Sequence, residues 1–324
     1  MKKWFTAFRK QDSFFGIVIT CISFLILAVF NPYFFAVNNL DSLQTSIAPN
    51  AIIAIGMMML MIMGMFDLSV GSVMCLSGVV TAYLLSRNTG IVLSTAGGLL
   101  TGAAIGALNG IMVAYGNIQP LIATIGTMYV FRGISETIMT SDIATSLTGF
   151  PESFNRFGGG KFLGLYSMVW ICILLLGLFM FLTKRTYVGR RGYYIGCSQD
   201  NARLMGINVK RHILTVYILS GLLSATAGIL SIARFETASR YLGKDLQMTI
   251  MIACIMGGGS LLGGKGDIQG ALFGTLFISL LSNGFNLFEI NPQWQNVTIG
   301  TILFLVVAAD GFMYIKRMRR KGRI

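Results

Sequence analysis

Residues 51–65 read Ala-Ile-Ile-Ala-Ile-Gly-Met-Met-Met-Leu-Met-Ile-Met-Gly-Met, a stretch without a charged side chain. This stretch belongs to a longer apolar run near residues 44–64, which a break at Phe66 and Asp67 separates from the next run at 68–86. A bilayer core about 30 Å thick needs about 20 apolar residues per helix. The stretch therefore predicts a membrane-spanning helix.

The same pattern recurs along the whole chain. Apolar runs lie near residues 14–31, 44–64, 68–86, 91–114, 120–139, 164–183, 212–233, 246–264, 268–288 and 296–315. With 54% hydrophobic and 11% charged residues, the chain has too few charges to cover a soluble globule. We predict an all-α polytopic membrane protein of about ten transmembrane helices. It forms a single integral-membrane domain over residues 1–324, because no segment between the runs could build a second one.

The basic residues of this chain, whose net charge is +13, cluster in three places. These are the start of the chain at 2–10, the central loop at about 184–211 and the tail at 316–323. Basic clusters beside span ends mark cytoplasmic segments, whereas a nucleic-acid surface would need a folded basic face. We therefore expect both termini and the central loop to be cytoplasmic, a loop at about 140–163 to be external, and no nucleic-acid partner.

Groups that could do chemistry are sparse. His212 is the sole histidine, and the five cysteines have no paired spacing, which argues against a catalytic triad and a metal site. Residues 259–265 begin like a phosphate-binding loop, but Gly266 stands where that loop needs Ser or Thr. We expect no catalytic residue, no metal and no cofactor or nucleotide bound by this chain.

Glycines are dense in two parts of the sequence. One set is Gly97, Gly98, Gly102, Gly106 and Gly110, and the other lies within 257–266. Small residues let helices approach closely in lipid, and the denser set could also break its helix beside a water-filled path. The breaks at 64–72 and 263–270 look alike, each with an aspartate that could cap the next helix. They suggest two pseudo-repeated halves.

Polar residues within the spans are candidates for a translocation path, because ionisable groups are costly in lipid. Arg132 and Glu136 lie four residues apart and could neutralise each other or face a wet cavity. Asp67 could be a helix cap, and the asparagines at 109, 283 and 286 could bind a hydroxylated substrate or join helices. The candidate path residues are Asp67, Ser69, Asn109, Arg132, Glu136 and Asn283.

The central loop contains a short helix candidate from about Gln199 to Met205, which Gly206 would close in the usual C-terminal position. A compact helix on the inner face could dock into another protein and move as a lever. Taken alone, it could equally be a solvated link.

Several motifs together make the chain similar to a known protein family. They are Asp67-Leu-Ser-Val-Gly-Ser72, Asn109-Gly110, Pro120 through Met128 with Arg132-Gly133, the loop from Gly189 to Val209, and Gly257-Gly258 through Gly270. From about Asn31 to Asp310 the chain resembles the permease subunits of bacterial ABC importers for ribose, xylose, arabinose and galactosides, which are related to branched-chain amino-acid permeases. Met65-Phe66 and Cys197-Ser198 depart from the usual pattern.

The resemblance implies a non-enzymatic subunit that imports a monosaccharide or similar small polar solute across the bacterial inner membrane. It implies three partners: a second permease, identical or different, an external solute-binding protein, and a cytoplasmic ABC ATPase that uses the ATP. It also implies that the ATPase grips Gln199, Asp200, Asn201, Ala202, Arg203, Leu204, Met205 and Gly206.

Two other functions remain as alternatives. A stand-alone ion-coupled secondary transporter would need an acidic relay in the membrane, and only Glu136 lies within a span core. A membrane-embedded enzyme would need a convergent reactive cluster, which the sequence does not reveal.

Overall fold

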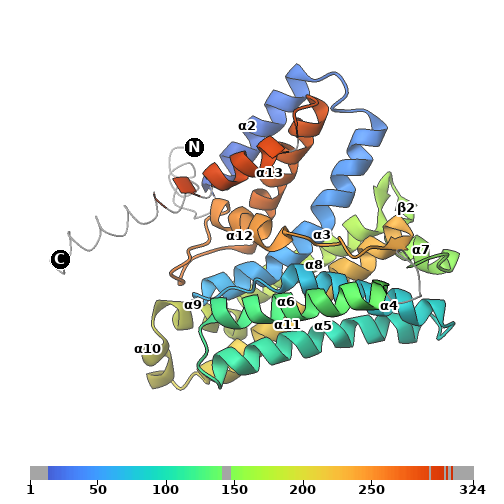
Figure 1. Ribbon diagram of the computed structural model, residues 1–324. Helices are drawn as coiled ribbons and strands as arrows, with labels where there is room; N and C mark the ends of the chain where they lie inside the picture. Colours follow the sequence, from blue (N-terminus) through green and yellow to red (C-terminus); the bar gives the residue numbers. More distant parts are fainter. Residues whose placement is uncertain (1–13, 141–146, 292, 303, 306–307, 309–324) are drawn as a thin grey trace.

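Helices dominate the computed structural model, which describes residues 14–140, 147–291, 293–302, 304, 305 and 308 (Figure 1). The helices are α2 (Phe14–Phe30), α3 (Val37–Ile62), α4 (Val70–Ser86), α5 (Ile91–Ala114), α6 (Pro120–Thr140), α7 (Glu152–Gly159), α8 (Ser167–Arg185), α9 (Tyr187–Cys197), α10 (Gln199–Leu204), α11 (Val209–Phe235), α12 (Leu246–Met256) and α13 (Ile268–Leu287). Residues 293–302 are also helical.

Five helices of the described chain are long and apolar enough to cross a membrane: α3, α5, α8, α11 and α13. Shorter apolar helices comprise residues 16–30, α4 and α12. Together they confirm the predicted class, a mostly helical polytopic membrane protein.

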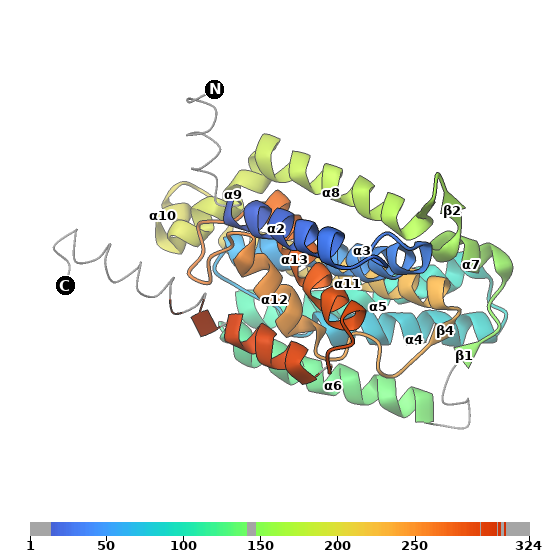
Figure 2. The ribbon, with the colours of Figure 1, turned by 90° about the horizontal axis from the view of Figure 1, so that it is seen from above.

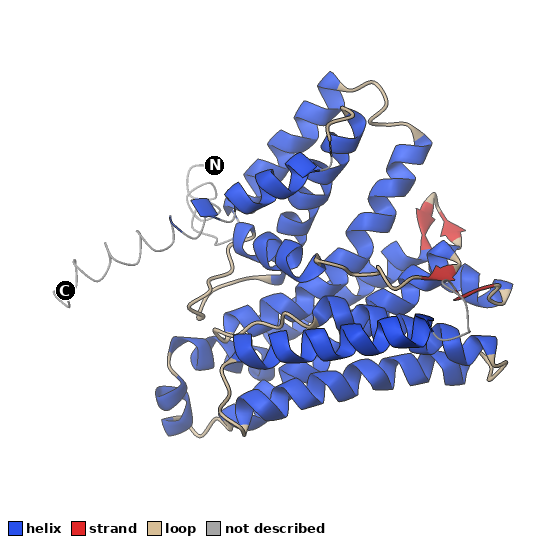
Figure 3. Cartoon of the chain, in the orientation of Figure 1, coloured by secondary structure: helices blue, strands red, loops and turns tan. Residues whose placement is uncertain are grey.

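Short strands occur only near α7 within the described chain (Figure 3). β1 (Leu147–Thr148) pairs antiparallel with β4 (Thr237–Ala238), and β2 (Lys161–Phe162) pairs with β3 (Leu165–Tyr166). Leu163 and Gly164 connect β2 to β3 with positive φ angles at both positions, as tight hairpins require. The predicted external loop at about 140–163 therefore contains a helix and hairpin of its own, apart from residues 141–146, which lie outside the described chain.

The boundaries of several predicted spans were wrong. The run at 246–264 is helical only to Met256, because Gly258, Gly263, Gly264 and Gly266 all adopt positive φ beyond it. Helix α3 begins at Val37 rather than at 44. Its first turns carry polar residues, so they do not look like part of an apolar run. The central loop contains the helix α9, and the last predicted span at 296–315 is described only up to residue 308.

Helix α11 lies at the centre of the fold and packs against α3, α4, α5 and α7. Helices α4, α5, α6 and α11 run side by side, while α2, α3 and α13 form a second group that crosses them at an angle (Figures 1 and 2). The α10 end and the α7 end lie at opposite ends of the first group (Figure 1).

Glycine lets α5 and α11 approach to backbone contact. A Cβ on Gly221 would collide with the carbonyl oxygen of Gly102, and a Cβ on Gly106 would collide with the carbonyl oxygen of Tyr217. This confirms that the predicted glycine set in 97–110 packs helices together.

We expect Gly221→Ala to destabilise the protein by about 1–3 kcal/mol, because the added methyl group has no space beside α5. Gly177→Ala in α8 is the matched control, since no atom lies within 4 Å of the Cβ that it would add. Melting temperatures in detergent measure both. Equal melting temperatures for the two variants would contradict the packing assignment.

Candidate functional site

A fully buried polar network lies at the start of α4. The Asp67 carboxylate accepts hydrogen bonds from the Ser69 backbone N–H (2.8 Å) and hydroxyl (2.6 Å). The Ser69 oxygen accepts a bond from the Asn109 amide (2.8 Å), and the Asn109 carbonyl accepts one from the Thr127 hydroxyl (2.8 Å). The structure thus brings together three of the predicted path residues, which come from the α3–α4 connection and α5.

The expectation that Asp67 caps the next helix was wrong. Helix α4 begins at Val70 with Ser69 at the cap position, and Asp67 instead closes a turn onto Ser69. Aspartate readily forms such turns with the residue two positions ahead. The Ser220 hydroxyl of α11 also points to Asp67, at 3.5 Å. Because Asp67, Ser69 and Asn109 are completely buried and bonded to one another, they hold α4, α5, α6 and α11 together in this conformation.

Asp267 does cap its helix, as expected. Its carboxylate accepts from the Gln269 N–H (3.3 Å) at the start of α13 and also pairs with Lys184 at 2.8 Å. The two aspartates therefore share a place in similar sequence breaks but have different local roles.

Arg132 holds a non-helical segment between β4 and α12, residues 239–245. Its Nη1 donates to the carbonyl oxygens of Leu242 (2.8 Å) and Arg240 (3.2 Å), and its Nη2 donates to that of Gly243 (3.0 Å). One guanidinium thus binds three backbone carbonyls of this segment. The predicted neutralisation of Arg132 by Glu136 stays a prediction, and the Glu136 side chain lies exposed one turn further along α6.

The segment 239–245 turns back along the first part of α4. The Cys75 sulfur lies 3.7 Å from the carbonyl oxygens of Ser239 and Arg240. Gly71 and Gly243 touch backbone to backbone, and a Cβ on either would collide with the carbonyl of the other. Gly243 also has a φ of 65°, so glycine is required there for both conformation and space.

Residues that the sequence analysis missed lie on the outer side of this segment. Tyr241 is 60% exposed, and Lys244 and Asp245 are also exposed. The Arg240 guanidinium donates to the Tyr241 hydroxyl (3.0 Å) and lies 5.0 Å from the centre of its ring. In the sequence these residues form a charged break between two apolar runs, a pattern that is typical of any loop between two helices.

Asn283 lies apart from these groups. Its amide donates to the Asn39 side chain at 2.6 Å and so joins α13 to α3. For Asn283 the structure favours the second of the two predicted roles, a link between helices.

The predicted short helix of the central loop is confirmed as α10. The Ser198 hydroxyl accepts from the Asn201 N–H (3.3 Å) at its start, and Gly206 follows its end with a φ of 78°. Ala202 is buried, whereas Leu204 is 87% exposed and Met205 is 63% exposed. One side of α10 therefore packs on the protein, and apolar side chains project from the other.

Helix α9 connects α10 to both glycine-rich breaks. The Gly264 N–H donates to the Ile62 carbonyl (2.8 Å), which links the end of α3 to the segment 257–267. Gly196 of α9 packs directly on both of these backbone groups, and the Tyr193 hydroxyl donates to the Gly266 carbonyl (2.9 Å). The two similar breaks thus meet at one crossing beneath α9.

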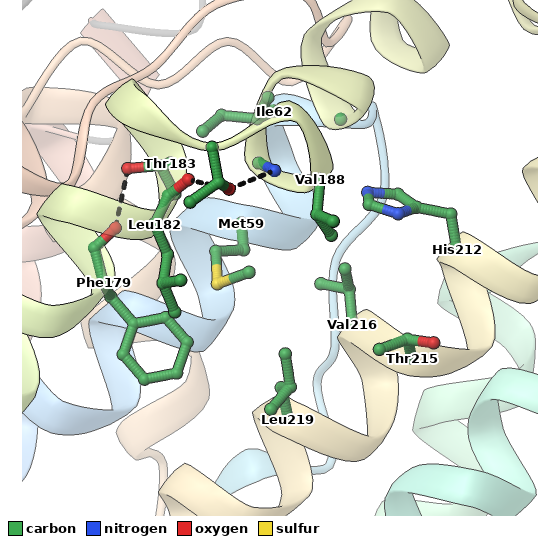
Figure 4. Close-up of a pocket in the computed structure, with 13 residues that line it drawn as sticks. Met59, Ile62, Phe179, Leu182, Thr183, Val188, His212, Thr215, Val216 and Leu219 are labelled. Carbon is green, nitrogen blue, oxygen red and sulfur yellow. Dashed lines mark hydrogen bonds between the residues drawn. The ribbon is translucent and has the colours of Figure 1, made fainter. Parts of the chain in front are cut away.

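A cavity of about 90 Å³ lies between α3, α8, α9 and α11 (Figure 4). Its lining is mainly apolar, and the hydroxyls of Thr183 and Thr186 donate to the carbonyls of Phe179 and Leu182. A larger open cavity of about 700 Å³ is lined by Phe66, Leu68, Leu121, Met248, Met251, Leu261, Gly300, Phe304 and Ala308. These apolar walls offer little to hold a polar ligand.

Comparisons with known proteins place the chain among transport proteins. Residues 39–307 match the family model described as branched-chain amino acid transport system / permease component. The chain is 34% identical over 312 residues to the ribose import permease protein RbsC of Haemophilus influenzae, with 95% of each chain covered. It is 35% identical to RbsC of Escherichia coli K12 (91% and 92% covered) and 32% identical to the L-arabinose ABC transporter permease protein AraH of Azospirillum brasilense (95% and 89% covered). No solved structure matches the chain significantly.

We expect Arg132→Met to destabilise the protein by about 2–4 kcal/mol, because three backbone carbonyls lose a charged donor. Arg156→Met is the control, since its ion pair with Glu152 is exposed and is worth less than about 1 kcal/mol. Thermal unfolding in detergent compares the two variants. If Arg132→Met loses no more stability than Arg156→Met, Arg132 does not stabilise the segment 239–245.

Proposed function

Because the chain belongs to the family of branched-chain amino acid transport system permease components, we propose that it is the permease subunit of an ABC importer that carries a monosaccharide into the cytoplasm. The observation that carries this proposal is similarity over nearly the whole chain to permeases named for ribose and L-arabinose. The apolar helices support a location in the bacterial inner membrane.

The proposed topology has about ten crossings and both termini in the cytoplasm. The α10 end faces the cytoplasm, because the basic residues Lys184, Arg185, Arg190 and Arg191 lie there, and the α7 end faces outward. The whole chain is one domain of two pseudo-repeated halves. The contact between the two similar breaks, where Gly64 packs against Gly263, supports this symmetry.

The proposed partners are a second permease, an external solute-binding protein and a separate ATPase that hydrolyses the ATP. The residues Gln199 to Gly206 form the contact with the ATPase. In support, α10 projects Leu204 and Met205 from the surface, and exposed apolar side chains are costly unless a partner covers them. This chain itself contributes no catalytic group and no cofactor.

The same geometry supplies a route for coupling. Movement of α10 would be passed to α9, and from Gly196 to the backbone of both breaks. The break after α3 leads to Asp67 and α4, and the segment 257–267 connects α12 to α13. A displacement at α10 therefore reaches the helices around the buried network through backbone contacts rather than through flexible side chains.

Uptake by membrane vesicles that contain the chain with its ATPase and binding protein tests the function. Radiolabelled ribose, allose and L-arabinose should include at least one sugar whose uptake requires ATP. Uptake without any ATPase subunit would favour the alternative, an ion-coupled secondary transporter. Failure with every monosaccharide, in vesicles where the complex is assembled, would reject the proposed substrate class.

We expect Leu204→Glu to reduce co-purification of the ATPase and ATP-dependent uptake at least about tenfold, because a charge would replace an apolar contact. Leu163→Glu is the matched control, since Leu163 is similarly exposed (78%) but lies on the hairpin at the opposite end. It should leave co-purification unchanged. Normal ATPase binding and uptake by Leu204→Glu would count against α10 as the contact.

A further inference from the structure

The segment 239–245 lies beside the middle of α6 rather than at its end. Helix α6 runs from Pro120 to Thr140, so it is about 31 Å long, and Arg132 lies about 18 Å from its start. The carbonyls that Arg132 binds belong to Arg240, Leu242 and Gly243. If α6 crosses the bilayer as proposed, the segment leads from β4 at the outward end to the carbonyls that Arg132 binds, near mid-depth.

The outer side of the segment is unsuited to lipid. Lys244 and Asp245 are exposed there with Tyr241, and Arg240 is half-buried beside them. An ionised side chain in the centre of a bilayer costs about 2.5–3.5 kcal/mol or more. Irregular backbone at membrane depth is likewise tolerated only in protein or beside a water-filled cavity. This surface must therefore face water or another protein chain.

The chemistry of the surface suits a neutral polyhydroxylated ligand. Arg240 and Lys244 offer hydrogen-bond donors and Asp245 offers acceptors, as hydroxyl groups need. The Tyr241 ring lies close to both cations, with the Lys244 ammonium 5.9 Å from its centre and the Arg240 guanidinium at 5.0 Å. The buried network at Asp67, by contrast, already uses its groups internally.

We propose that Arg240, Tyr241, Lys244 and Asp245 form a sugar-contacting station at mid-depth of the translocation path, with Arg132 as the residue that positions its backbone. This inference rests on the proposed function. The cavity of about 700 Å³ that begins at Met248 and Met251 of α12 is apolar, so a sugar leaving the station meets a surface that does not retain it. Weak contacts of this kind permit release as well as entry.

Water access to the station is tested with single cysteines in the assembled importer. Tyr241→Cys, Lys244→Cys and Asp245→Cys are made in a chain whose exposed Cys21 and Cys197 are serine, while the buried Cys75, Cys172 and Cys254 remain. A charged methanethiosulfonate reagent labels thiols that water reaches. Leu163→Cys on the hairpin is the accessible control. Leu174→Cys is the lipid-facing control, because it is 69% exposed on α8, on the opposite side of the molecule from α6 (Figure 2).

The station cysteines should label at least about tenfold faster than Leu174→Cys, and the transported sugar should slow their labelling at least about threefold. Labelling as slow as that of Leu174→Cys would overturn the proposal, and so would labelling that sugar leaves unchanged while the importer transports. Asp245→Asn gives a second measurement, because it should raise the sugar concentration for half-maximal uptake at least about threefold with ATPase binding intact.

The two proposals fail in different ways. If the unmodified importer takes up no monosaccharide, the proposed function fails, whatever the labelling rates are. If the unmodified importer transports sugar and Asp245→Asn matches it, only the station is rejected.

Discussion

Backbone groups inside a bilayer must find their hydrogen bonds within the protein, and this constraint explains most of the structure. A helix satisfies its own backbone hydrogen bonds. Other contacts are needed only where a helix ends. The break after α3 is closed by the turn of Asp67 onto Ser69, and the segment 257–267 is joined to α3 through Gly264 and Ile62. The segment 239–245 is neither strand nor helix, and Arg132 binds three of its carbonyls.

The sequence predicted well whatever depends on neighbours along the chain. Apolar runs identified most of the helices, and the pattern up to Gly206 predicted α10 to within one residue at its end, because capping is local. The predicted helix ends were wrong in two kinds of place. After Met256, glycines end the helix although the sequence stays apolar, and in α3 the helix begins among polar residues before the apolar run. Those errors share one cause: hydropathy reports burial, whereas the end of a helix depends on backbone conformation.

The candidate site was less predictable, because its contacts join distant parts of the chain. The sequence suggested that Arg132 and Glu136, one turn apart, could neutralise each other or face a wet cavity, and it gave no sign that the guanidinium also binds carbonyls more than a hundred residues further on. Likewise the sequence made Asp67, Ser69 and Asn109 candidates for a translocation path, but it could not show that these side chains bond to one another in a buried junction between helices. The exposure of Tyr241, Lys244 and Asp245 is the basis on which we propose them as sugar contacts.

The two sides of α10 differ in what they contact. Ala202 packs into the protein and Gly206 sets the chain reversal, whereas Leu204 and Met205 extend from the surface. The inward residues set how the helix packs on α9, and in the proposed complex the outward residues contact the ATPase. Substitutions of the outward pair could therefore adapt the protein to a different ATPase while the helices within the lipid stay unchanged. The proposed ATPase contact and the proposed sugar path could therefore change independently in evolution.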